Sequence, residues 1–266
     1  MALALDLAGR VVLVTGGNRG VGLGISQAFV DAGATVITCS RSEADSVGAE
    51  HRVCDVRDAA GTTALVEGIV ADHGRLDVLV NNAGGSPGAD AATASPRFHA
   101  KIVELNLVAP LTLSQAAYAA MSRQDAGGSI VNISSVSGHR ASPGTVAYGA
   151  AKAGLDSVTR TLAVEWAPKV RVNSIVVGMV LTEQSDLTYG DDASIAAIAA
   201  TVPLGRFATP ADIGAVAVFL ASPLASYVTG SSIEVHGGGE APAWFTALHR
   251  VRDESASFVT SQQEEA

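Results

Sequence analysis

Short apolar segments alternate with Ala-rich segments of helical period along most of this chain, and this alternation limits the possible folds more than any other feature. The first apolar segment, residues 10–15, precedes residues 22–32, where hydrophobic residues recur at helical spacing. Strands that are apolar throughout belong to a sheet that is covered on both faces. Repeated strand–helix–strand units with right-handed crossovers therefore predict an α/β fold, a single-domain doubly wound parallel sheet with helices on both faces.

The same pattern predicts the bounds of the individual elements. We expect strands at residues 10–15, 34–40, 52–55, 76–81, 129–134, 170–177 and 232–235. We expect helices at residues 22–32, 62–73, 98–124, 146–166 and 211–222. Because no linker interrupts the alternation, residues 1–239 are predicted to form one domain, followed by a C-terminal extension at residues 240–266.

Composition narrows the range of partners and compartments. With 48% hydrophobic residues in 266, the chain can bury a large core. A net charge of −9 argues against a nucleic-acid partner, which requires clustered Lys and Arg. No segment has the pattern of a signal peptide or a membrane span. Cys39 and Cys54 suit reduced core thiols and lack the spacing of a zinc site. We therefore expect a cytoplasmic protein without metal, membrane or nucleic-acid partner.

The loop after the first predicted strand is rich in glycine. It reads Thr15-Gly16-Gly17-Asn18-Arg19-Gly20-Val21-Gly22. Glycines at this position let the backbone turn tightly and approach a pyrophosphate, whose charge is stabilised at the N-terminus of the next helix. Glycine-rich turns also occur for steric reasons alone. The position of this one, between a strand and a helix, favours a dinucleotide site in a Rossmann-like sheet.

The end of the second predicted strand indicates which dinucleotide binds. An acidic residue there would bind the ribose 2′-hydroxyl, whereas an arginine accommodates a 2′-phosphate. This chain has Ser40 and Arg41 at that point, and Arg19 of the glycine loop can reach the same region. Two guanidinium groups without a carboxylate favour NADP(H) over NAD(H). The alternative is that Arg41 is only a solvated loop residue and that nearby Glu43 serves NAD.

Tyr148 and Lys152 stand four residues apart on a predicted helix, which places them on one face. A free tyrosine has a pKa of about 10, too high for easy proton exchange at neutral pH. An adjacent ammonium favours the phenolate, so we expect Lys152 to lower the pKa of Tyr148. By itself the pair is a weak signal, because this spacing is common on exposed helix faces.

From about residue 7 to residue 239 the chain resembles the short-chain dehydrogenase/reductase family. Individually each match is modest, but together and in this order they are specific. The matching residues are the glycine loop, Asp55 after the third strand, Asn81-Asn82-Ala83-Gly84 after the fourth, Asn106 in a helix, Ser135 thirteen residues before Tyr148, and the Tyr148/Lys152 pair.

The resemblance implies a catalytic role for four side chains. Tyr148 would be the general acid or base on the substrate oxygen, and Ser135 would hydrogen-bond that oxygen. Lys152 would lower the tyrosine pKa and bind the nicotinamide ribose. Asn106 would hold a water of the proton relay; the alternative is that it bonds only to backbone. Ser134 is a second candidate for the catalytic serine, but the spacing favours Ser135.

The resemblance also implies which residues contact the coenzyme, from the adenine at Asp55 and Val56 to the nicotinamide carboxamide at Val180 and Thr182. The full predicted set is Gly16, Asn18, Arg19, Gly20, Val21, Gly22, Ser40, Arg41, Asp55, Val56, Asn82, Ala83, Gly84, Tyr148, Lys152, Gly178, Val180 and Thr182. A homo-oligomer, either tetramer or dimer, is the expected assembly.

The chain departs from the family pattern in three places. Val177-Gly178 stands where a Pro-Gly pair is usual, and the segment between Arg41 and Asp55 is so short that its helix must be abbreviated or lost. The chain also runs past the usual family end. There, an apolar stripe is expected to dock on a neighbouring subunit, or else to fray; it consists of Trp244, Phe245, Leu248 and Val251.

Residues 179–204 are expected to cover the substrate, and they contain no Lys or Arg. Their apolar residues, Met179, Leu187, Tyr189, Ile195, Ile198 and Val202, predict a hydrophobic alcohol or ketone, steroid-like or acyl. His139 and His236 lie on loops near the site without metal-ligand partners. Two alternatives stay open: an NAD-dependent alcohol dehydrogenase of the same family, and a dinucleotide-sensing protein without turnover.

Overall fold

The computed structural model describes residues 5–45 and 48–243. In this part of the chain, parallel strands form a seven-stranded sheet in the order β3-β2-β1-β4-β5-β6-β7. The strands are β1 (Val11–Thr15), β2 (Thr35–Ser40), β3 (Glu50–Val53), β4 (Val78–Asn81), β5 (Gly128–Ser135), β6 (Val170–Val177) and β7 (Ser232–Val235). The predicted fold class is confirmed. The strand order reverses between β1 and β4, and such a switch point is where open α/β sheets bind ligands.

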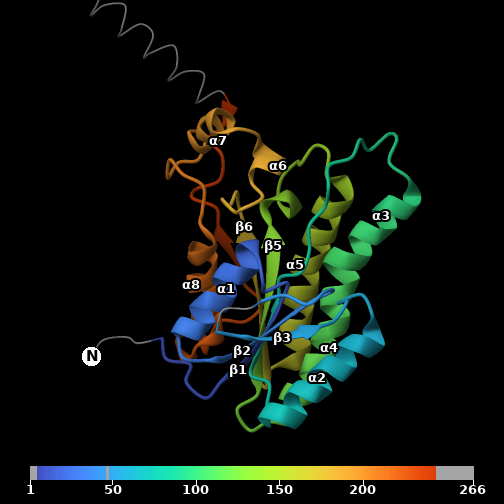
Figure 1. The fold of residues 1–266 in the computed structure, drawn as a ribbon, viewed down its shortest axis with the longest axis vertical. Coiled ribbons are helices and arrows are strands. Elements are labelled where there is room, and N and C mark those ends of the chain that lie inside the picture. Colours follow the sequence, from blue (N-terminus) through green and yellow to red (C-terminus); the bar gives the residue numbers. More distant parts are fainter. Residues whose placement is uncertain (1–4, 46–47, 244–266) are drawn as a thin grey trace, which may run out of the picture.

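Helices cover both faces of the sheet (Figure 1). On one face lie α1 (Gly20–Asp31) and α8 (Pro210–Ala221), and on the other lie α2 (Ala59–His73), α4 (Ala109–Met121) and α5 (Val146–Trp166). The packing of β1 explains why its residues 11–14 are all apolar. Val11 and Leu13 pack into the core on the α2–α4–α5 side, whereas Val12 and Val14 pack into the core on the α1–α8 side.

The predicted helix at residues 98–124 is wrong in one respect, because the segment is not one regular helix. It consists of α3 (Pro96–Val103), a π-helical turn η1 (Glu104–Val108) and then α4. Pro110 has no N–H to donate to the carbonyl of Asn106, so the regular helical hydrogen bonding cannot continue through this point. The irregular turn places Asn106, with a fully buried side chain, next to the site described below.

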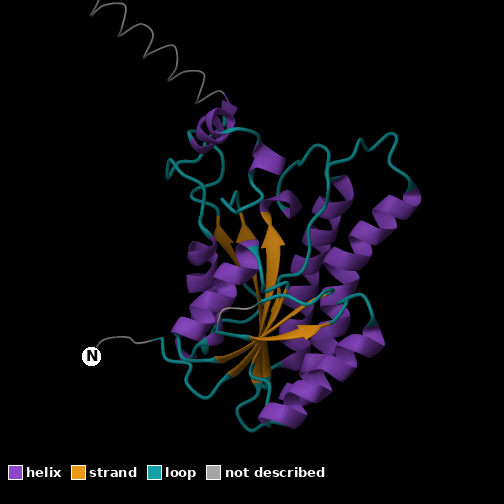
Figure 2. Cartoon of the chain, viewed as in Figure 1, coloured by secondary structure: helices purple, strands orange, loops and turns teal. Residues whose placement is uncertain are grey.

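The segment between β2 and β3 contains no helix in its described residues, as its short length predicted. Two short helices that the hydrophobic pattern did not reveal, α6 (Asp186–Tyr189) and α7 (Asp192–Ala199), lie above the carboxyl ends of the strands (Figure 2). Asp191 caps α7 by accepting a hydrogen bond from Ser194 N. The remaining turns are the 3₁₀ segments η2 (Val136–Gly138) and η3 (Pro223–Ala225).

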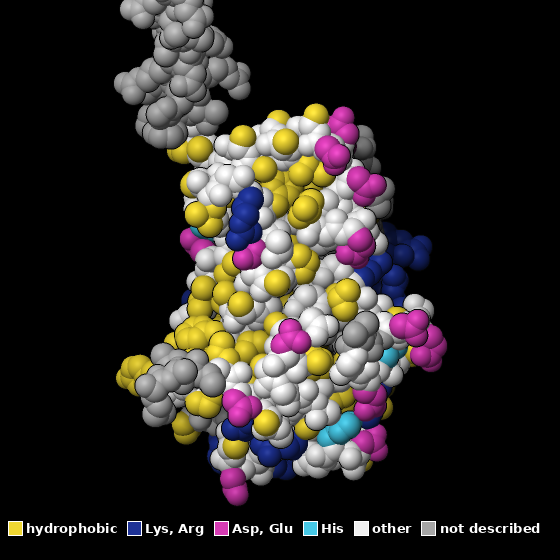
Figure 3. Space-filling view, turned by 60° about the vertical axis from the view of Figure 1, so that its left-hand side comes forward, with side chains coloured by type: hydrophobic (Ala, Val, Ile, Leu, Met, Phe, Trp, Pro, Cys, Tyr) yellow, Lys and Arg dark blue, Asp and Glu magenta, His cyan; other side chains and the backbone are white. Residues whose placement is uncertain are grey.

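The surface carries both signs of charge. On the face that Figure 3 brings forward, acidic and basic side chains are interspersed, and hydrophobic side chains gather in the middle and upper parts. No helix among those described is long and apolar enough to cross a membrane. Cys39 and Cys54 are buried and unpaired, as expected of core thiols. The stripe predicted at Trp244, Phe245, Leu248 and Val251 lies outside the described residues.

Candidate active site

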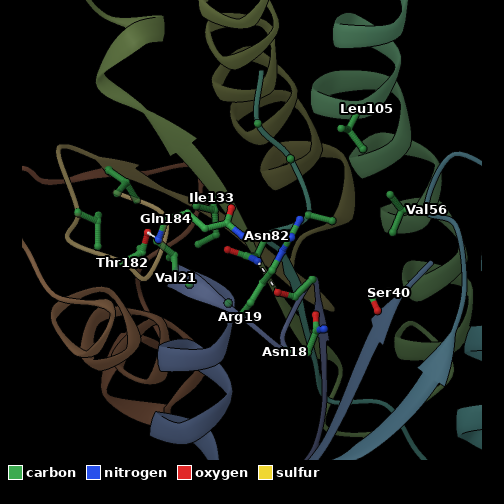
Figure 4. Close-up of a pocket in the computed structure, with 18 of the residues that line it drawn as sticks. Asn18, Arg19, Val21, Ser40, Val56, Asn82, Leu105, Ile133, Thr182 and Gln184 are labelled. Atoms are coloured by element: carbon green, nitrogen blue, oxygen red, sulfur yellow. Dashed lines mark hydrogen bonds between the residues drawn. The ribbon is translucent and has the colours of Figure 1, made fainter. Parts of the chain in front are cut away.

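A pocket of about 620 Å³ lies at the carboxyl ends of the central strands. It is lined by the glycine loop, by the ends of β2, β4, β5 and β6, and by residues that follow β6 (Figure 4). Of the predicted site residues, only Asn106 is absent from its lining. The sheet therefore brings predicted site residues as far apart in sequence as Gly16 and Thr182 to a single cavity.

The glycine loop approaches its neighbours more closely than side chains would allow. Gly16 has a φ of +62°, a conformation that favours glycine. A Cβ on Gly22 would lie 2.1 Å from the carbonyl oxygen of Gly16, which excludes any larger residue. Asn82, which follows β4, stabilises this turn. Its Nδ2 donates to the carbonyl oxygens of Thr15 at 2.9 Å and Gly16 at 3.2 Å. The loop is therefore a preformed backbone cradle at the N-terminus of α1.

Three arginines line the pocket near the end of β2: Arg19, Arg41 and Arg57. Asp55 is held by Arg57 through two charged hydrogen bonds, of 3.0 Å to Nε and 2.6 Å to Nη2. The hydrogen bonds from Arg57 hold the pKa of Asp55 down at about 2, with a smaller contribution from Arg41. Among the described residues, neither Arg19 nor Arg41 forms an ion pair, and both are exposed. Asp55, the carboxylate that lines the pocket beside these arginines, is thus already neutralised by Arg57.

Tyr148 and Lys152 project from α5 toward Ser135 at the end of β5. Lys152 Nζ lies 5.5 Å from the centroid of the Tyr148 ring. The Ser135 hydroxyl lies close enough to the phenol to lower its pKa. Ser134 faces the opposite way, because its Oγ donates to Asp156 Oδ2 at 2.9 Å. Of the two serines, only Ser135 therefore lies where it can meet a substrate oxygen together with Tyr148.

The expected effect of Lys152 on the pKa of Tyr148 is wrong for this structure. Burial raises the pKa of the phenol, the hydrogen bond with Ser135 lowers it, and Tyr189 raises it further. Burial also lowers the pKa of Lys152 to about 8, while attraction to Asp156 acts in the opposite direction. The lysine ammonium donates to the carbonyl oxygen of Ile133 at 2.7 Å rather than to the phenol. Burial is therefore the largest cause of both shifts, and it favours the neutral form of each group.

Among the described residues, the side chain of Asn106 forms hydrogen bonds only to backbone atoms. Its Nδ2 donates to Gly85 O and Ile102 O, both at 2.9 Å, and its Oδ1 accepts from Gly85 N at 2.8 Å. A Cβ on Gly84 would lie 2.7 Å from Asn106 Oδ1 and 3.4 Å from Lys152 Nζ, so this glycine separates the two side chains. The bonding pattern matches the alternative that Asn106 bonds to backbone, and it ties η1 to the loop after β4.

The segment after β6 covers the pocket with polar side chains that the hydrophobic pattern had not indicated. Gln184 and Thr188 line it beside Tyr189, whose ring packs edge-to-face on Phe207 with centroids 4.9 Å apart. Of the predicted apolar residues whose side chains the structure describes, only Tyr189 lines this pocket. The Leu187 side chain lies outside the described part of the chain. Met179 and Val202 instead line a separate cavity of about 80 Å³, while Ile195 and Ile198 line neither.

Glu183 reaches from this segment to the glycine loop, 163 positions away in sequence. Its Oε1 accepts a hydrogen bond of 3.1 Å from the backbone N–H of Gly20, at the first residue of α1. Helix N-termini attract anions, and here a side-chain carboxylate already occupies that position. No sequence motif indicated this contact.

The residues present fit a bound dinucleotide. The glycine cradle has room for a diphosphate only because its glycines lack side chains, and the arginines at the far end offer donors for a phosphate group. In the part of the chain that the structure describes, no group of His, Cys, Asp and Glu could hold a metal ion. The lining residues that sequence reasoning missed are Arg57, Leu105, Ile133, Glu183, Gln184, Ser185 and Thr188, along with several neighbours of the predicted ones.

Comparisons with known proteins agree with this geometry. A family model described as enoyl-(acyl carrier protein) reductase matches residues 16–240. The chain is 38% identical over 254 residues to L-fucose dehydrogenase from Oryctolagus cuniculus, covering 90% of this chain and 88% of that protein. It is 34% identical over 245 residues to 3alpha-hydroxysteroid dehydrogenase from Mediterraneibacter gnavus, covering 87% and 97%.

A solved structure from Beutenbergia cavernae, a provisionally assigned NAD(P)-dependent gluconate 5-dehydrogenase with NADP bound at low occupancy, superimposes with a TM-score of 0.80. It is 36% identical and covers 88% of this chain and 98% of its own. The motifs, the fold and these relatives lead to one conclusion. The chain belongs to the short-chain dehydrogenase/reductase family, as an oxidoreductase that acts on alcohol or ketone substrates with NAD(P).

Proposed function

We propose that this chain interconverts a hydrophobic alcohol and its ketone with NADP(H), and that Tyr148 is the general acid and base. One observation carries the proposal. The hydroxyls of Ser135 and Tyr148 and the ammonium of Lys152 line the same pocket as the glycine cradle and the arginines. The dinucleotide, when bound, supplies the hydride acceptor or donor; the protein supplies orientation and the proton.

The preference for NADP(H) rests on charge at the end of β2. A 2′-phosphate there would meet the guanidinium groups of Arg19 and Arg41, with Ser40 as a further donor. Asp55 does not oppose this, because Arg57 neutralises it. Glu43, the residue that would favour NAD, is not among the residues that line the pocket.

The proton chemistry rests on Tyr148. In the reductive direction the phenol donates its proton to the carbonyl oxygen, and its raised pKa means that it is protonated before the reaction. Ser135 donates a hydrogen bond to the same oxygen. The positive charge of Lys152 then stabilises the phenolate that is left. In this proposal any relay water contacts the main chain of Asn106, since its amide is bound to backbone.

The preference for a hydrophobic substrate is supported by the segment that follows β6. Residues 178–189 contain no Lys or Arg, and the ring of Tyr189, which packs on Phe207, lines the pocket. Gln184 and Thr188 also line the pocket, and this observation favours a second candidate, a polyhydroxylated alcohol without a phosphate group.

A panel of ketones, aldoses and ketoses with NADPH and with NADH tests these preferences, with loss of reduced nicotinamide as the readout. We expect turnover with NADPH and the apolar ketones. Turnover only with sugars would favour the second candidate, and equal or better turnover with NADH would refute the coenzyme preference.

Tyr148→Phe tests the catalytic role. We expect kcat to fall by roughly 10²–10⁴-fold while NADPH binds almost normally. The matched control is Tyr227→Phe, at a fully exposed tyrosine. A Tyr148→Phe protein with unchanged turnover would refute the role of this phenol. A Tyr148→Phe protein that keeps its biological effect without turnover would favour the sensing protein.

We also propose that the chain acts in the cytoplasm as a homo-oligomer, tetramer or dimer, with residues 1–239 as one domain. Light scattering on the full chain and on a chain that ends at residue 240 tests the assembly and the role of the extension. A monomeric full chain would refute the proposed homo-oligomer.

A further inference from the structure

A buried carboxylate lies one helical turn beyond Lys152. Asp156 projects from α5 and is only 2% exposed. Its Oδ2 accepts from Ser134 Oγ at 2.9 Å and contacts His139 Nε2 at 2.8 Å. Its Oδ1 accepts from Ser174 Oγ at 2.8 Å. Donors from three separate elements thus converge on one carboxylate, the arrangement that favours the charged form of a buried acid.

Lys152 lacks a comparable partner of its own. Its side chain is 3% exposed, and its ammonium donates a hydrogen bond to the carbonyl oxygen of Ile133. No carboxylate of the described residues lies within salt-bridge distance of it. Removing an ammonium from water in this way favours its neutral form, unless a negative charge is close enough to compensate.

Among the groups around Lys152, Asp156 is the negative charge that can compensate for the burial of its ammonium. On α5 itself these groups are Tyr148 and Asp156. The polar side chains that surround Lys152 and Asp156 from β5, β6 and η1 are uncharged: Ser134, Ser174 and Asn106. The loop after β5 contributes His139, which contacts the carboxylate rather than the lysine. Glu183 is bound to Gly20, and Tyr189 is a phenol whose pKa burial raises, so it is uncharged.

We propose that Asp156 is a positioning residue for the reaction, which keeps the buried Lys152 protonated while Ser134, Ser174 and His139 hold its carboxylate in place. The inference rests on the proposed role of Lys152 beside Tyr148. Attraction to Asp156 is the one effect that raises the pKa of Lys152 against burial. Without it, burial would lower the pKa of Lys152 further and favour the neutral amine.

The lysine can be observed directly, because the chain has only three: Lys101, Lys152 and Lys169. With lysine labelled at Cε with ¹³C, NMR follows each ammonium through its titration in the full, coenzyme-free chain, and Lys152→Met assigns the signal. In the wild type we expect Lys152 to titrate near 8. In Asp156→Asn we expect its pKa to be lower by about one unit, with the other two lysines unchanged.

Glu165→Gln is the matched control, since it removes one carboxylate from the exposed face of the same helix and should leave Lys152 unchanged. Asp156→Glu, which keeps the charge, should restore most of the shift. An unchanged Lys152 pKa in Asp156→Asn overturns the inference. A wild-type Lys152 pKa below about 7 also overturns it, and this test does not need the Asp156→Asn protein to fold.

Kinetics separate this inference from the proposed function. Because kcat/KM reports the free enzyme, Asp156→Asn should lose about fivefold at pH 8 and almost nothing at pH 6, if Lys152 titrates one unit lower. A shifted lysine pKa without any turnover in the wild type would refute the proposed function and leave the charge relation intact. Turnover with the same pH profile in both proteins would overturn the inference.

Discussion

Glu183→Gln should tighten NADPH binding, because it removes a carboxylate from the place where the diphosphate is expected. In the coenzyme-free structure Glu183 Oε1 accepts from Gly20 N at 3.1 Å, at the start of α1. A diphosphate bound at the same N-terminus must either displace this carboxylate or lie beside it. Glutamine keeps the size and polarity of the side chain and can still accept a hydrogen bond, so the change isolates the charge.

The size of the effect follows from Coulomb's law. Two unit charges about 5 Å apart in a medium like water repel by ~0.8 kcal/mol, and a diphosphate carries about two charges. Glu183 is exposed and can turn into solvent, which removes part of this repulsion. We therefore expect a gain of about 1 kcal/mol, or roughly a fivefold lower Kd for NADPH. The coenzyme-free variant should be slightly less stable, since a favourable charge at the helix N-terminus has gone.

Titration of NADPH fluorescence at low and high salt measures this effect. The advantage of Glu183→Gln should shrink as salt rises, because exposed charges more than about 10 Å apart are screened at 0.1 M and closer ones are screened at higher salt. Asp192→Asn, an exposed acid in the first turn of α7, is the control for general charge. Equal or weaker NADPH binding by Glu183→Gln, or an equal gain in the control, would refute the reasoning.

Three further changes follow from the site. Lys152→Met should abolish turnover yet raise Tm at pH 7 by a few degrees, because the pKa of Lys152 falls from 10.5 to about 8 on folding. Below pH 8 the charged lysine therefore destabilises the fold by up to about 3 kcal/mol, and above pH 10.5 it costs nothing, so the difference in Tm should disappear at high pH. Arg41→Gln should weaken NADPH about tenfold and leave NADH unchanged in equilibrium titrations, with Glu43→Gln as control; equal losses for both coenzymes would contradict the 2′-phosphate contact. Gly22→Ala should abolish NADPH binding, since its Cβ would lie 2.1 Å from a loop carbonyl, whereas Gly88→Ala, with open space around it, should bind normally in the same titration.

The sheet and its helices could be predicted because burial on both faces leaves a direct trace in the sequence. A strand such as β1 is apolar from Val11 to Val14, because successive residues enter the cores on opposite faces of the sheet. Helices α6 and α7 left no such trace, because they lie above the strand ends, and no residue of α7 is buried. The interruption at η1 was missed for another reason. Pro110 breaks the helical hydrogen bonding without changing the hydrophobic pattern.

Parts of the site could be predicted where residues adjacent in sequence act together. The glycine loop and the Tyr148/Lys152 pair are local motifs. Contacts between distant segments were not predictable, since nothing in the local sequence around Glu183 or Asp156 identifies the partner. The pairing of Arg57 with Asp55 was missed although they are only two residues apart, because it depends on the turn that follows β3.

The pKa of Tyr148 shows why residue spacing alone does not determine chemistry. Four-residue spacing on a helix correctly brings an ammonium toward a phenol, but the strength of their interaction depends on how much water both have lost. Here burial raises the pKa of the phenol and lowers that of the lysine, so each group by itself favours its neutral form. A neutral pair could not stabilise a phenolate. For Tyr148 to exchange protons, the charge of Lys152 must therefore be maintained from outside the pair, and the hydrogen-bonded carboxylate of Asp156 is the group in position to do so.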